Sequence, residues 1–335
     1  MSRVIEARRA ILSIAAAVCI GPAASWAQTA PAAGSAPFPI KPVRYVVPFG
    51  AGGSPDLVAR VIADRLTRLW GHQVLVDNRA GVAGVLGTAI VAKAPPDGHT
   101  LVQCNVASSG IGVTLFTKIP YDHHRDIAAV TRIGLTPNII TVHPSMPIKT
   151  VKQLIAYARA NPGKLSYASG QVGTSPQLSM ELLKLMTKID IVNIPYKIGA
   201  QGITDNMAGQ IPVGISNFPA SVAPVQSGRL RPLAVTGATR VAQLRDVPTV
   251  QEAGLPDFEV NSWQGVCAPS ATPAALLDKL NADINSVLRI PEVQQRMEEL
   301  VMIGAQTTRD EFDQFIRAEI ARWAKVIKEA KIPLQ

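Results

Sequence analysis

The sequence has few residues of the kinds that carry enzyme chemistry, metal binding or nucleic-acid recognition. It holds three cysteines and five histidines, and aromatic residues make up 5% of the chain. No two histidines have the i, i+4 spacing of metal ligands on one helix face. No Lys/Arg cluster stands beside aromatics that could stack on bases. We therefore expect no metal site, no cofactor and no nucleic-acid partner.

Long apolar runs are also missing. Residues 1–27 combine three arginines, an apolar run over residues 11–20 and a small-x-small sequence that ends at Ala27. That run is far shorter than the roughly 20 residues that a membrane span needs. The pattern predicts a secretory signal peptide cleaved near Ala27, and a mature chain without direct membrane insertion. Arg8-Arg9 weakly resembles a twin-arginine signal, so the export route stays open.

Two cysteines remain after the signal peptide is removed. Cys104 and Cys267 both lie in apolar stretches, which predicts buried free thiols in preference to a disulfide, although an oxidising compartment would permit one. The loss of three arginines and Glu6 lowers the formal net charge from +9 to +7. A basic surface favours solubility, and it would also attract anionic solutes.

The mature chain begins with a segment of small, uncharged residues. Residues 28–40 read QTAPAAGSAPFPI, which is typical of a flexible lead-in. We expect regular structure to begin near Lys41, because residues 43–49 are largely apolar and read as a buried strand. An amphipathic helix follows, with Ser54 as its predicted cap and Gly71 at its end.

A second copy of this pattern occurs later in the chain. GGSPDL at residues 52–57 matches GTSPQL at residues 173–178, and each lies between a predicted strand and an amphipathic helix. The loops RAGVAG and KIGAQG then correspond, and each half has a strand that stops at an asparagine, Asn105 or Asn217. This order predicts two similar α/β domains with largely parallel sheets.

The order of the copies also predicts the domain boundaries. C-terminal helical patterns would complete the first domain, which then comprises residues 41–139 plus 260–335. Residues 140–259 would form the second domain. The chain would cross between the domains near residues 140 and 258, and we expect these crossings to act as hinges.

Three interpretations compete for the glycine-rich loop at residues 50–56. The first is a dinucleotide fingerprint, in which Asp77 would be the ribose-binding acid and the protein a dinucleotide-dependent oxidoreductase. Pro55 stands where the third glycine of that fingerprint belongs, so the fingerprint is incomplete. The second interpretation is a purely structural turn that binds nothing.

The third interpretation depends on the duplication. Loops at the carboxyl ends of parallel strands converge on a ligand crevice, and a helix start presents unpaired N–H groups with partial positive charge. Pro55 and Pro176 each remove an N–H that would otherwise need an acceptor. Glycine lets a carboxylate approach the backbone closely. Two such loops facing each other predict a two-sided site for an anion.

Many blocks of the sequence resemble the Bug-type receptors, which are the periplasmic solute-binding proteins of tripartite tricarboxylate transporters. They include FPIKPVRYVVPFGAGGSPDLVARVIADRL, VDNRAGVAGVLGTAIVAKAPPDGHTL and NPGKLSYASGQVGTSPQLSMELL, and they cover essentially the whole mature chain in the family's order. The resemblance implies a monomeric periplasmic receptor with a flytrap-like fold and no enzymatic activity. Its ligand cleft would close on a small organic carboxylate, which is then delivered to the membrane subunits of a transporter. A sensor kinase stays open as an alternative partner, and so does the identity of the acid.

The resemblance also implies which residues bind the ligand. In the family, the two glycine-rich loops grip a carboxylate, partly through bridging waters. Asp56 would buttress the first loop. Asn105, Tyr196 and Asn217 lie outside the two loops and are assigned as ligand contacts by their position alone. Carried over to this sequence, the ligand-binding residues are Phe49, Gly50, Ala51, Gly52, Gly53, Ser54, Asp56, Asn105, Gly170, Gln171, Val172, Gly173, Thr174, Ser175, Tyr196 and Asn217.

Some positions depart from the family pattern. Ser216 stands where an acid is common, Gln177 where a histidine is common and Ile198 where a glycine is usual. Without the acid, we expect ligands with a free ammonium group to be disfavoured relative to uncharged-tail or dicarboxylic acids. Trp263 resembles a family tryptophan near the cleft, and packing in the core or at the hinge explains it equally well.

Overall fold

The computed structural model describes residues 38–335. The predicted signal peptide and most of the predicted lead-in lie outside these residues. Ordered packing begins slightly before the expected position, because Phe38 contacts Trp70 with 5.6 Å between ring centroids. The Ile40 amide also donates a hydrogen bond to His99 Nε2 at 3.3 Å.

The strands form one connected network in the order β2-β1-β3-β9-β4-β7-β5-β6, with β8 and β10 also paired to β4. Their bounds are β1 Val43–Val47, β2 Val74–Asn78, β3 Thr100–Asn105, β4 Ile127–Val142, β5 Ser166–Ser169, β6 Val192–Pro195, β7 Val213–Asn217, β8 Arg231–Val235, β9 Asn261–Pro269 and β10 Ile303–Gly304.

Helices follow most of the strands. The α-helices are α1 Ser54–Trp70, α2 Val85–Ala92, α3 Gly112–Leu115, α4 His123–Asp126, α5 Val151–Ala160, α6 Ser175–Thr187, α7 Gly199–Met207, α8 Phe218–Gln226, α9 Ala274–Leu288, α10 Pro291–Glu299 and α11 Arg309–Glu329. Two 3-10 turns, η1 Val82–Gly84 and η3 Ala242–Leu244, and one π-helical turn, η2 Ala107–Ile111, complete the described part of the chain.

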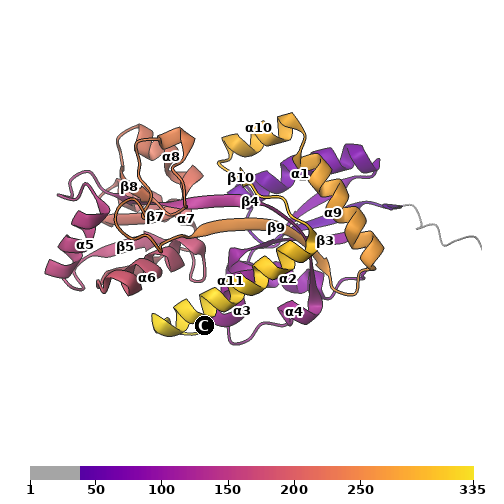
Figure 1. The fold of residues 1–335 in the computed structure, drawn as a ribbon, viewed down its shortest axis with the longest axis horizontal. Helices are drawn as coiled ribbons and strands as arrows, with labels where there is room; N and C mark the ends of the chain where they lie inside the picture. Colours follow the sequence, from indigo (N-terminus) through magenta and orange to yellow (C-terminus); the bar gives the residue numbers. More distant parts are fainter. Residues whose placement is uncertain (1–37) are drawn as a thin grey trace, which may run out of the picture. The chain divides into compact units, whose positions relative to one another are not determined.

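The strand order contains the same arrangement twice. In what we call the first half, β1 pairs in parallel with β2 and β3, and β9 then adds antiparallel to β3 and to β4. In the second half, β5 pairs in parallel with β6 and β7, and the end of β4 adds antiparallel to β7 and to β8. This confirms the predicted pair of similar α/β halves, which Figure 1 shows with helices packed around each set of strands.

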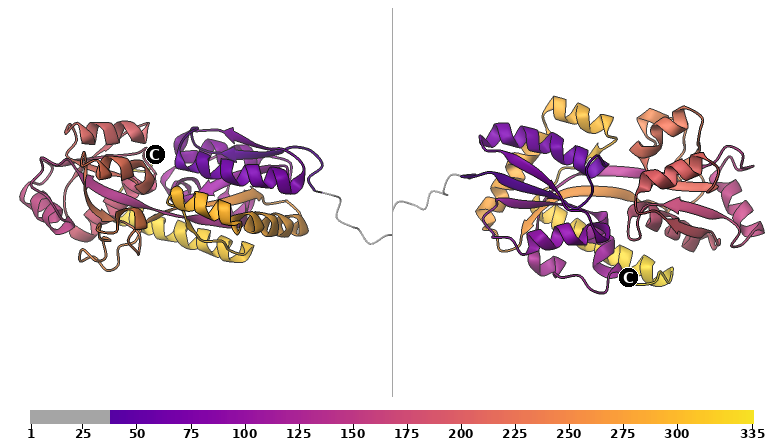
Figure 2. Two further views of the ribbon diagram at one scale, coloured as in Figure 1. Left: turned by 90° about the horizontal axis from the view of Figure 1, so that it is seen from above. Right: turned by 180° about the vertical axis from the view of Figure 1, so that it is seen from behind.

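Strand β4 belongs to both halves. Its residues 127–137 pair with β9, and its residues 138–142 pair with β7. The chain returns to the first half where β9 begins at Asn261. Figure 2, seen from behind, shows β4 and β9 running side by side between the two groups of helices. The predicted domain boundaries and the action of the crossings as hinges stay predictions.

Local sequence explains how the helices begin and end. Helix α1 buries Val58, Ile62 and Leu66, and it ends at Gly71 in the left-handed conformation with φ 66°. The prediction that Ser54 caps α1 was wrong. The cap position is Gly53, and no side chain caps the helix. Ser54 is instead the first helical residue.

Helix α11 is held against the shared strands by buried aromatic residues. Trp263 of β9 is 1% exposed and packs edge-on against Phe312 and Phe315 of α11. Its indole N–H donates to Glu319 at 3.0 Å, and Trp323 donates to the same carboxylate oxygen. Of the two roles considered for Trp263, the structure therefore supports packing between β9 and α11.

The cysteine prediction was wrong. Cys104 on β3 and Cys267 on β9 form a disulfide with 5.8 Å between their Cα atoms. The two residues are 163 positions apart, and the sequence does not show that β9 returns beside β3. Disulfides persist in oxidising compartments. The bond therefore agrees with an exported protein.

Candidate ligand-binding site

Two glycine-rich loops occupy equivalent places in the two halves. The first loop, residues 49–54, joins β1 to α1, and the second loop, residues 170–175, joins β5 to α6. Each turns through a glycine in the left-handed region, Gly52 with φ 82° and Gly173 with φ 86°. Side chains other than glycine are strained in that region, so the glycines at these two positions are required by the turn.

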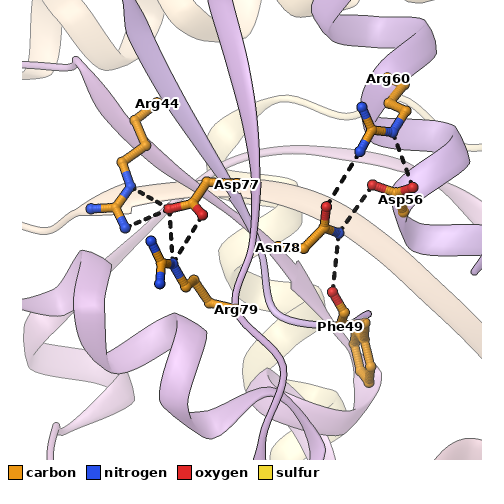
Figure 3. A network of polar contacts seen from close by, with 7 residues as sticks. All are labelled: Arg44, Phe49, Asp56, Arg60, Asp77, Asn78 and Arg79. Atoms are coloured by element: carbon orange, nitrogen blue, oxygen red, sulfur yellow. Dashed lines mark hydrogen bonds and ion pairs between the residues drawn. The ribbon is translucent and has the colours of Figure 1, made fainter. Parts of the chain in front are cut away.

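A buried carboxylate braces the first loop. Asp56 is 2% exposed, and its Oδ2 accepts hydrogen bonds from the Gly52 N–H at 2.8 Å and from Arg60 at 3.0 Å. Asn78, at the end of β2, donates to Asp56 Oδ1 at 3.0 Å and to the Phe49 carbonyl at 3.1 Å, as Figure 3 shows. Burial opposes ionisation of Asp56, yet the bonds from Arg60, Gly52 and Asn78 outweigh it and hold the pKa of Asp56 below its ordinary value.

A neutral side chain braces the second loop in the same way. Gln177 is 4% exposed, and its Oε1 accepts a hydrogen bond from the Gly173 N–H at 2.8 Å. Thr174 fastens the loop further by donating to the Gln171 carbonyl at 2.7 Å. Asp56 and Gln177 each stand four residues after the glycine that they hold. One brace is charged and the other is not.

Both helix starts leave backbone N–H groups available. The Leu57 amide pairs with Gly53, and the Leu178 amide pairs with Thr174. Among residues 38–335, no acceptor pairs with the amides at positions 54 and 56 of the first half or at positions 175 and 177 of the second. The residue between each pair is a proline, which has no N–H. Each half therefore presents two N–H groups at the positive end of a helix.

A buried amide side chain lies behind each of the two serines. Asn105 of β3 is opposite Gln264 of β9, and Asn217 of β7 is opposite Asn138 of β4. Ser54 Oγ lies 3.5 Å from Gln264 Nε2, and Ser175 Oγ lies 3.4 Å from Asn138 Oδ1. Gln264 also bonds to Gln103, and Asn138 also bonds to Ser179 and Asn217.

The sequence reasoning missed these amides, and it missed Asn78. Gln264 and Asn138 are polar residues within largely apolar strands. That contrast was a readable signal, but nothing local indicates which loop they approach. Asn78 is likewise a polar residue of β2, a strand that begins with three apolar residues.

The two predicted asparagines have different surroundings. Asn105 is 3% exposed, and its Oδ1 accepts from the amides of Ala107 and Ser108, while its Nδ2 donates to the Gln103 carbonyl. Asn217 is only half-buried, and its Nδ2 donates to Asn138 Oδ1 at 2.9 Å. Its Oδ1 has no donor among the described residues. Only Asn217 therefore has a polar atom left for a ligand.

Comparison with known proteins identifies the family of the chain. The model of the tripartite tricarboxylate transporter family receptors matches residues 58–332. The chain belongs to this family. It is 34% identical over 299 residues to the protein BugT of Bordetella pertussis, covering 89% of this chain and 92% of the relative. It is 37% identical over 298 residues to a UPF0065 protein from the tcbD-tcbE intergenic region of Pseudomonas sp. strain P51, covering 88% of each.

Solved structures of receptors show the same fold. Rpa4515 of R. palustris, solved with adipate, is 36% identical and superposes with a TM-score of 0.82, covering 88% of this chain and 99% of its own. MatC of Rhodopseudomonas palustris, solved with malate, is 29% identical with a TM-score of 0.78, covering 87% of this chain and 100% of its own. Members of the family are solute-binding receptors.

Tyr196 has its polar end already engaged. Its hydroxyl donates to Asp205 at 2.7 Å, and its ring lies against Gly202, where a Cβ would come within 2.9 Å. Desolvation and the adjacent carboxylate raise the pKa of Tyr196 to about 12. Packing therefore accounts for this residue better than a contact to a ligand.

Asp77, the acid of the dinucleotide interpretation, is committed to two arginines. Its Oδ2 accepts from Arg44 Nε at 2.7 Å and from Arg79 Nε at 3.1 Å. Figure 3 shows this cluster separate from the group around Asp56. Partial burial opposes ionisation, but the arginines outweigh it and hold the pKa of Asp77 below its ordinary value. A ribose would have to displace an ion-paired side chain.

The second loop also contacts the first half. A Cβ placed on Gly173 would lie 3.1 Å from Leu115 Cδ2 and 3.3 Å from Phe116 Cζ. Leu115 is the last residue of α3, so this loop lies against the segment that follows the first half's π-helical turn. A side chain at position 173 would therefore push against the other half as well as strain the turn.

A small polar cavity lies within the second half, beside β7. It has about 10 Å³ of space for the centre of a water molecule, close to the minimum for one water. Ser216 faces it and hydrogen-bonds to Ser221 Oγ at 2.7 Å. The polar or glycine residues around it include Thr141, Ser169, Asn206, Gly214, Ser216 and Ser221.

No helix within residues 38–335 combines the length and apolar character needed to cross a bilayer. Nor do the described residues contain a group of three or more His, Cys, Asp or Glu side chains placed to hold a metal ion.

Proposed function

We propose that the protein is a periplasmic receptor that binds a small organic carboxylate between its two halves and delivers it to the membrane subunits of a tripartite transporter. The observation that carries this proposal is the matched pair of helix starts. Each offers two unpaired N–H groups behind a glycine loop, with a proline between them. Such N–H groups and the helix dipole favour a bound anion.

The ligand would be held by the two loops, residues 49–54 and 170–175, with Asp56 acting as a brace for the first. Asn217 joins the proposed contacts because its amide oxygen is free, whereas Asn105 and the Tyr196 hydroxyl are already engaged in hydrogen bonds within the protein. The malate and adipate in the related receptors support a carboxylate as the ligand class. Closure around the ligand would bend the crossings near residues 140 and 258 and shift the population from open to closed.

The proposal makes the protein a monomeric binding protein and not an enzyme. The groups at the loops are backbone amides, hydroxyls and carboxamides, which bind anions but do not exchange protons near neutral pH. Asp56, the titratable group nearest the loops, is buried and fully hydrogen-bonded. The disulfide supports an oxidising compartment, which agrees with export by the predicted signal peptide.

A thermal-shift screen of the mature protein tests the proposal. The panel comprises mono-, di- and tricarboxylates, aromatic acids, amino acids and NAD(P)H, and hits are followed by calorimetry. A ligand that binds only the folded protein raises the free energy of unfolding by about 2.7 kcal/mol when its concentration is 100 times its Kd. We expect one or more carboxylates to raise the midpoint, and the cofactors to have no effect.

Two variants make the screen specific to the loop. Gly53 has φ −77°, and a Cβ there would make only ordinary contacts, 3.7 Å from the Gly50 carbonyl oxygen and from Pro55 Cδ, so Gly53→Val obstructs the helix start without straining the turn. We expect it to abolish the shift, whereas Ser286→Ala on the exposed part of α9 leaves the shift unchanged. A shift by NAD(P)H alone, or a carboxylate shift that survives Gly53→Val, would refute the proposed site.

A further inference from the structure

The hydrogen-bond direction at Ser175 is fixed by its neighbours. Ser179 donates its only hydrogen to the Ser175 carbonyl at 2.8 Å, so it can only accept from Asn138 Nδ2 at 2.9 Å. This orients Asn138 with its oxygen toward Ser175 and Asn217. Asn138 Oδ1 then accepts from Asn217 Nδ2 at 2.9 Å and from the Ser175 hydroxyl at 3.4 Å.

The second half consequently presents acceptors. Because Ser175 gives its hydrogen to Asn138, the two lone pairs of its oxygen are available. Asn217 Oδ1 is available too, because residue 219 is a proline and has no N–H to donate. In the first half, the corresponding Asn105 oxygen is occupied by the amide of Ala107.

The first half has the opposite direction at its serine. Gln103 Nε2 donates to Gln264 Oε1 at 2.7 Å, which leaves Gln264 Nε2 facing Ser54 at 3.5 Å. Reversing both amides would leave the buried Gln103 NH₂ without an acceptor, which is rarer than the unpaired carbonyl oxygen that the present orientation leaves. Ser54 therefore accepts from Gln264 and keeps its hydrogen to donate.

These directions distinguish between classes of ligand. A carboxylate offers acceptors only, so it suits Ser54 and the free N–H groups but cannot satisfy Ser175 and Asn217 Oδ1. Those two atoms need a donor on the ligand. None of the residues bonded to Asn138 or Asn217 is a carboxylate, and Ser216 is neutral. The donor is therefore a neutral hydroxyl in preference to an ammonium group.

We infer that Ser175, Asn138 and Asn217 form a subsite for a hydroxyl group, and that the receptor prefers hydroxy acids over the same acids without the hydroxyl. This inference rests on the proposed function, because it assumes that a carboxylate binds between the loops. Asn217 is half-buried, so water can replace the ligand hydroxyl in part. One neutral hydrogen bond then corresponds to a preference of about 3- to 10-fold.

Calorimetry with matched acids tests the subsite. The pairs are malate and succinate, lactate and propionate, and 2-hydroxyglutarate and glutarate, with both enantiomers of each hydroxy acid. We expect the better enantiomer to bind about 3- to 10-fold more tightly than its unsubstituted partner in the pair that fits the cleft.

Three variants separate the two halves. Asn217→Leu keeps the shape and removes the acceptor, so the ratio within each pair should fall to about one. Ser175→Ala should lower the same ratio, because it removes the other acceptor of the subsite, the Ser175 hydroxyl oxygen. Ser54→Ala should weaken both members of a pair by the same factor and leave their ratio unchanged, and circular dichroism checks that each variant is folded.

The outcomes are distinguishable from failure of the proposed function. A wild-type ratio of one, with tight carboxylate binding, overturns the hydroxyl subsite and leaves the receptor function intact; water would then occupy the subsite. A preference that persists in both Asn217→Leu and Ser175→Ala also overturns the subsite. Binding of none of the acids overturns both proposals.

Discussion

The two halves of the fold carry different side chains at the same place in the same strand pair. When the two halves are aligned by strand register so that Asn105 corresponds to Asn217, Cys104 corresponds to Ser216 and Cys267 corresponds to Thr141. The first half closes this position with a disulfide. The second half has a small polar cavity there, lined by both of its residues. The same backbone is thus fixed covalently in one half and only by hydrogen bonds in the other.

The two loop braces differ in a related way. Position 60, one turn after Asp56, is an arginine that pairs with it, whereas the equivalent position 181, one turn after Gln177, is a glutamate. A carboxylate at 177 would face a like charge on its own helix and would lack a cation to offset burial. The neutral brace therefore follows from its helix, and the comparison shows that each loop glycine is held by a side-chain acceptor, charged in the first half and neutral in the second.

Removal of the disulfide should have the largest effect on stability. We expect Cys104→Ala with Cys267→Ala to lower the free energy of unfolding by about 2–5 kcal/mol. Ser216→Ala, at the equivalent position of the second half, should cost only about 0.5–1.5 kcal/mol for its lost hydrogen bond. Urea unfolding measures both. Reductant should lower the wild-type midpoint and leave the cysteine-free variant unchanged; an insensitive wild type would contradict the prediction.

Removal of the charged brace should lower the stability of the protein more than removal of the neutral one. Asp56→Ala leaves the Gly52 N–H, Arg60 and Asn78 without their acceptor, and we expect a loss of about 1.5–3 kcal/mol. Gln177→Ala removes one neutral acceptor and should cost about 0.5–1.5 kcal/mol. Both are measured by urea unfolding at pH 7. Equal losses would mean that the charge contributes nothing to the first loop.

An acid at position 216 should change the ligand class. Ser216→Asp places a negative charge beside Asn217, and we expect about a tenfold loss of affinity for the best carboxylate through like-charge repulsion. Amino acids should lose less, because their ammonium group gains an attraction. Calorimetry compares this variant with Ser216→Asn, which is similar in size and uncharged. Unchanged carboxylate affinity in Ser216→Asp would refute the expectation.

Acid should weaken the first loop and not the second. The pKa of Asp56 is held below its ordinary value, so its ionised form stabilises the fold at neutral pH. That contribution is lost as the pH falls from about 4, the ordinary Asp value, through the lower folded pKa. We therefore expect the stability difference between wild type and Asp56→Asn to shrink as the pH is lowered through this range.

This shrinkage should be smaller than the full cost of Asp56→Ala, because a protonated Asp56 still accepts hydrogen bonds and only the contribution of its charge is lost. The corresponding difference between wild type and Gln177→Ala should not depend on pH in this range, since Gln177 does not ionise. Urea unfolding at several pH values gives both differences. If the stability difference between wild type and Asp56→Asn did not change with pH, the charge of Asp56 would not contribute to stability.

The sequence was informative where the structure depends on local pattern. Strand, glycine loop, Ser-Pro and helix follow one another directly, so both loops and both helix starts could be predicted from residues 43–71 and their repeat. The capping box of Thr308 and Glu311 is equally local, and it is present at the start of α11.

The rest depends on which distant strands become neighbours. The disulfide joins β3 to β9, and the amides behind the serines come from β4 and β9. No local pattern reveals that these strands pair. The contrast between Asn105 and Asn217 was accessible in principle. Ala107 stands two positions after Asn105 and donates its N–H to that asparagine. Pro219 stands two positions after Asn217 and has no N–H, so the Asn217 oxygen stays free.

Strand β4 connects the candidate site to a buried tryptophan. Asn138 touches the loop serine of the second half, and three residues earlier Leu135 is paired with Trp263 of β9. Any rotation of one half relative to the other must twist this continuous backbone next to a buried indole that is bonded to Glu319. If the halves rotate on ligand binding, as proposed, we expect the intrinsic tryptophan fluorescence of the protein to change with it, so that binding could be followed without an attached label.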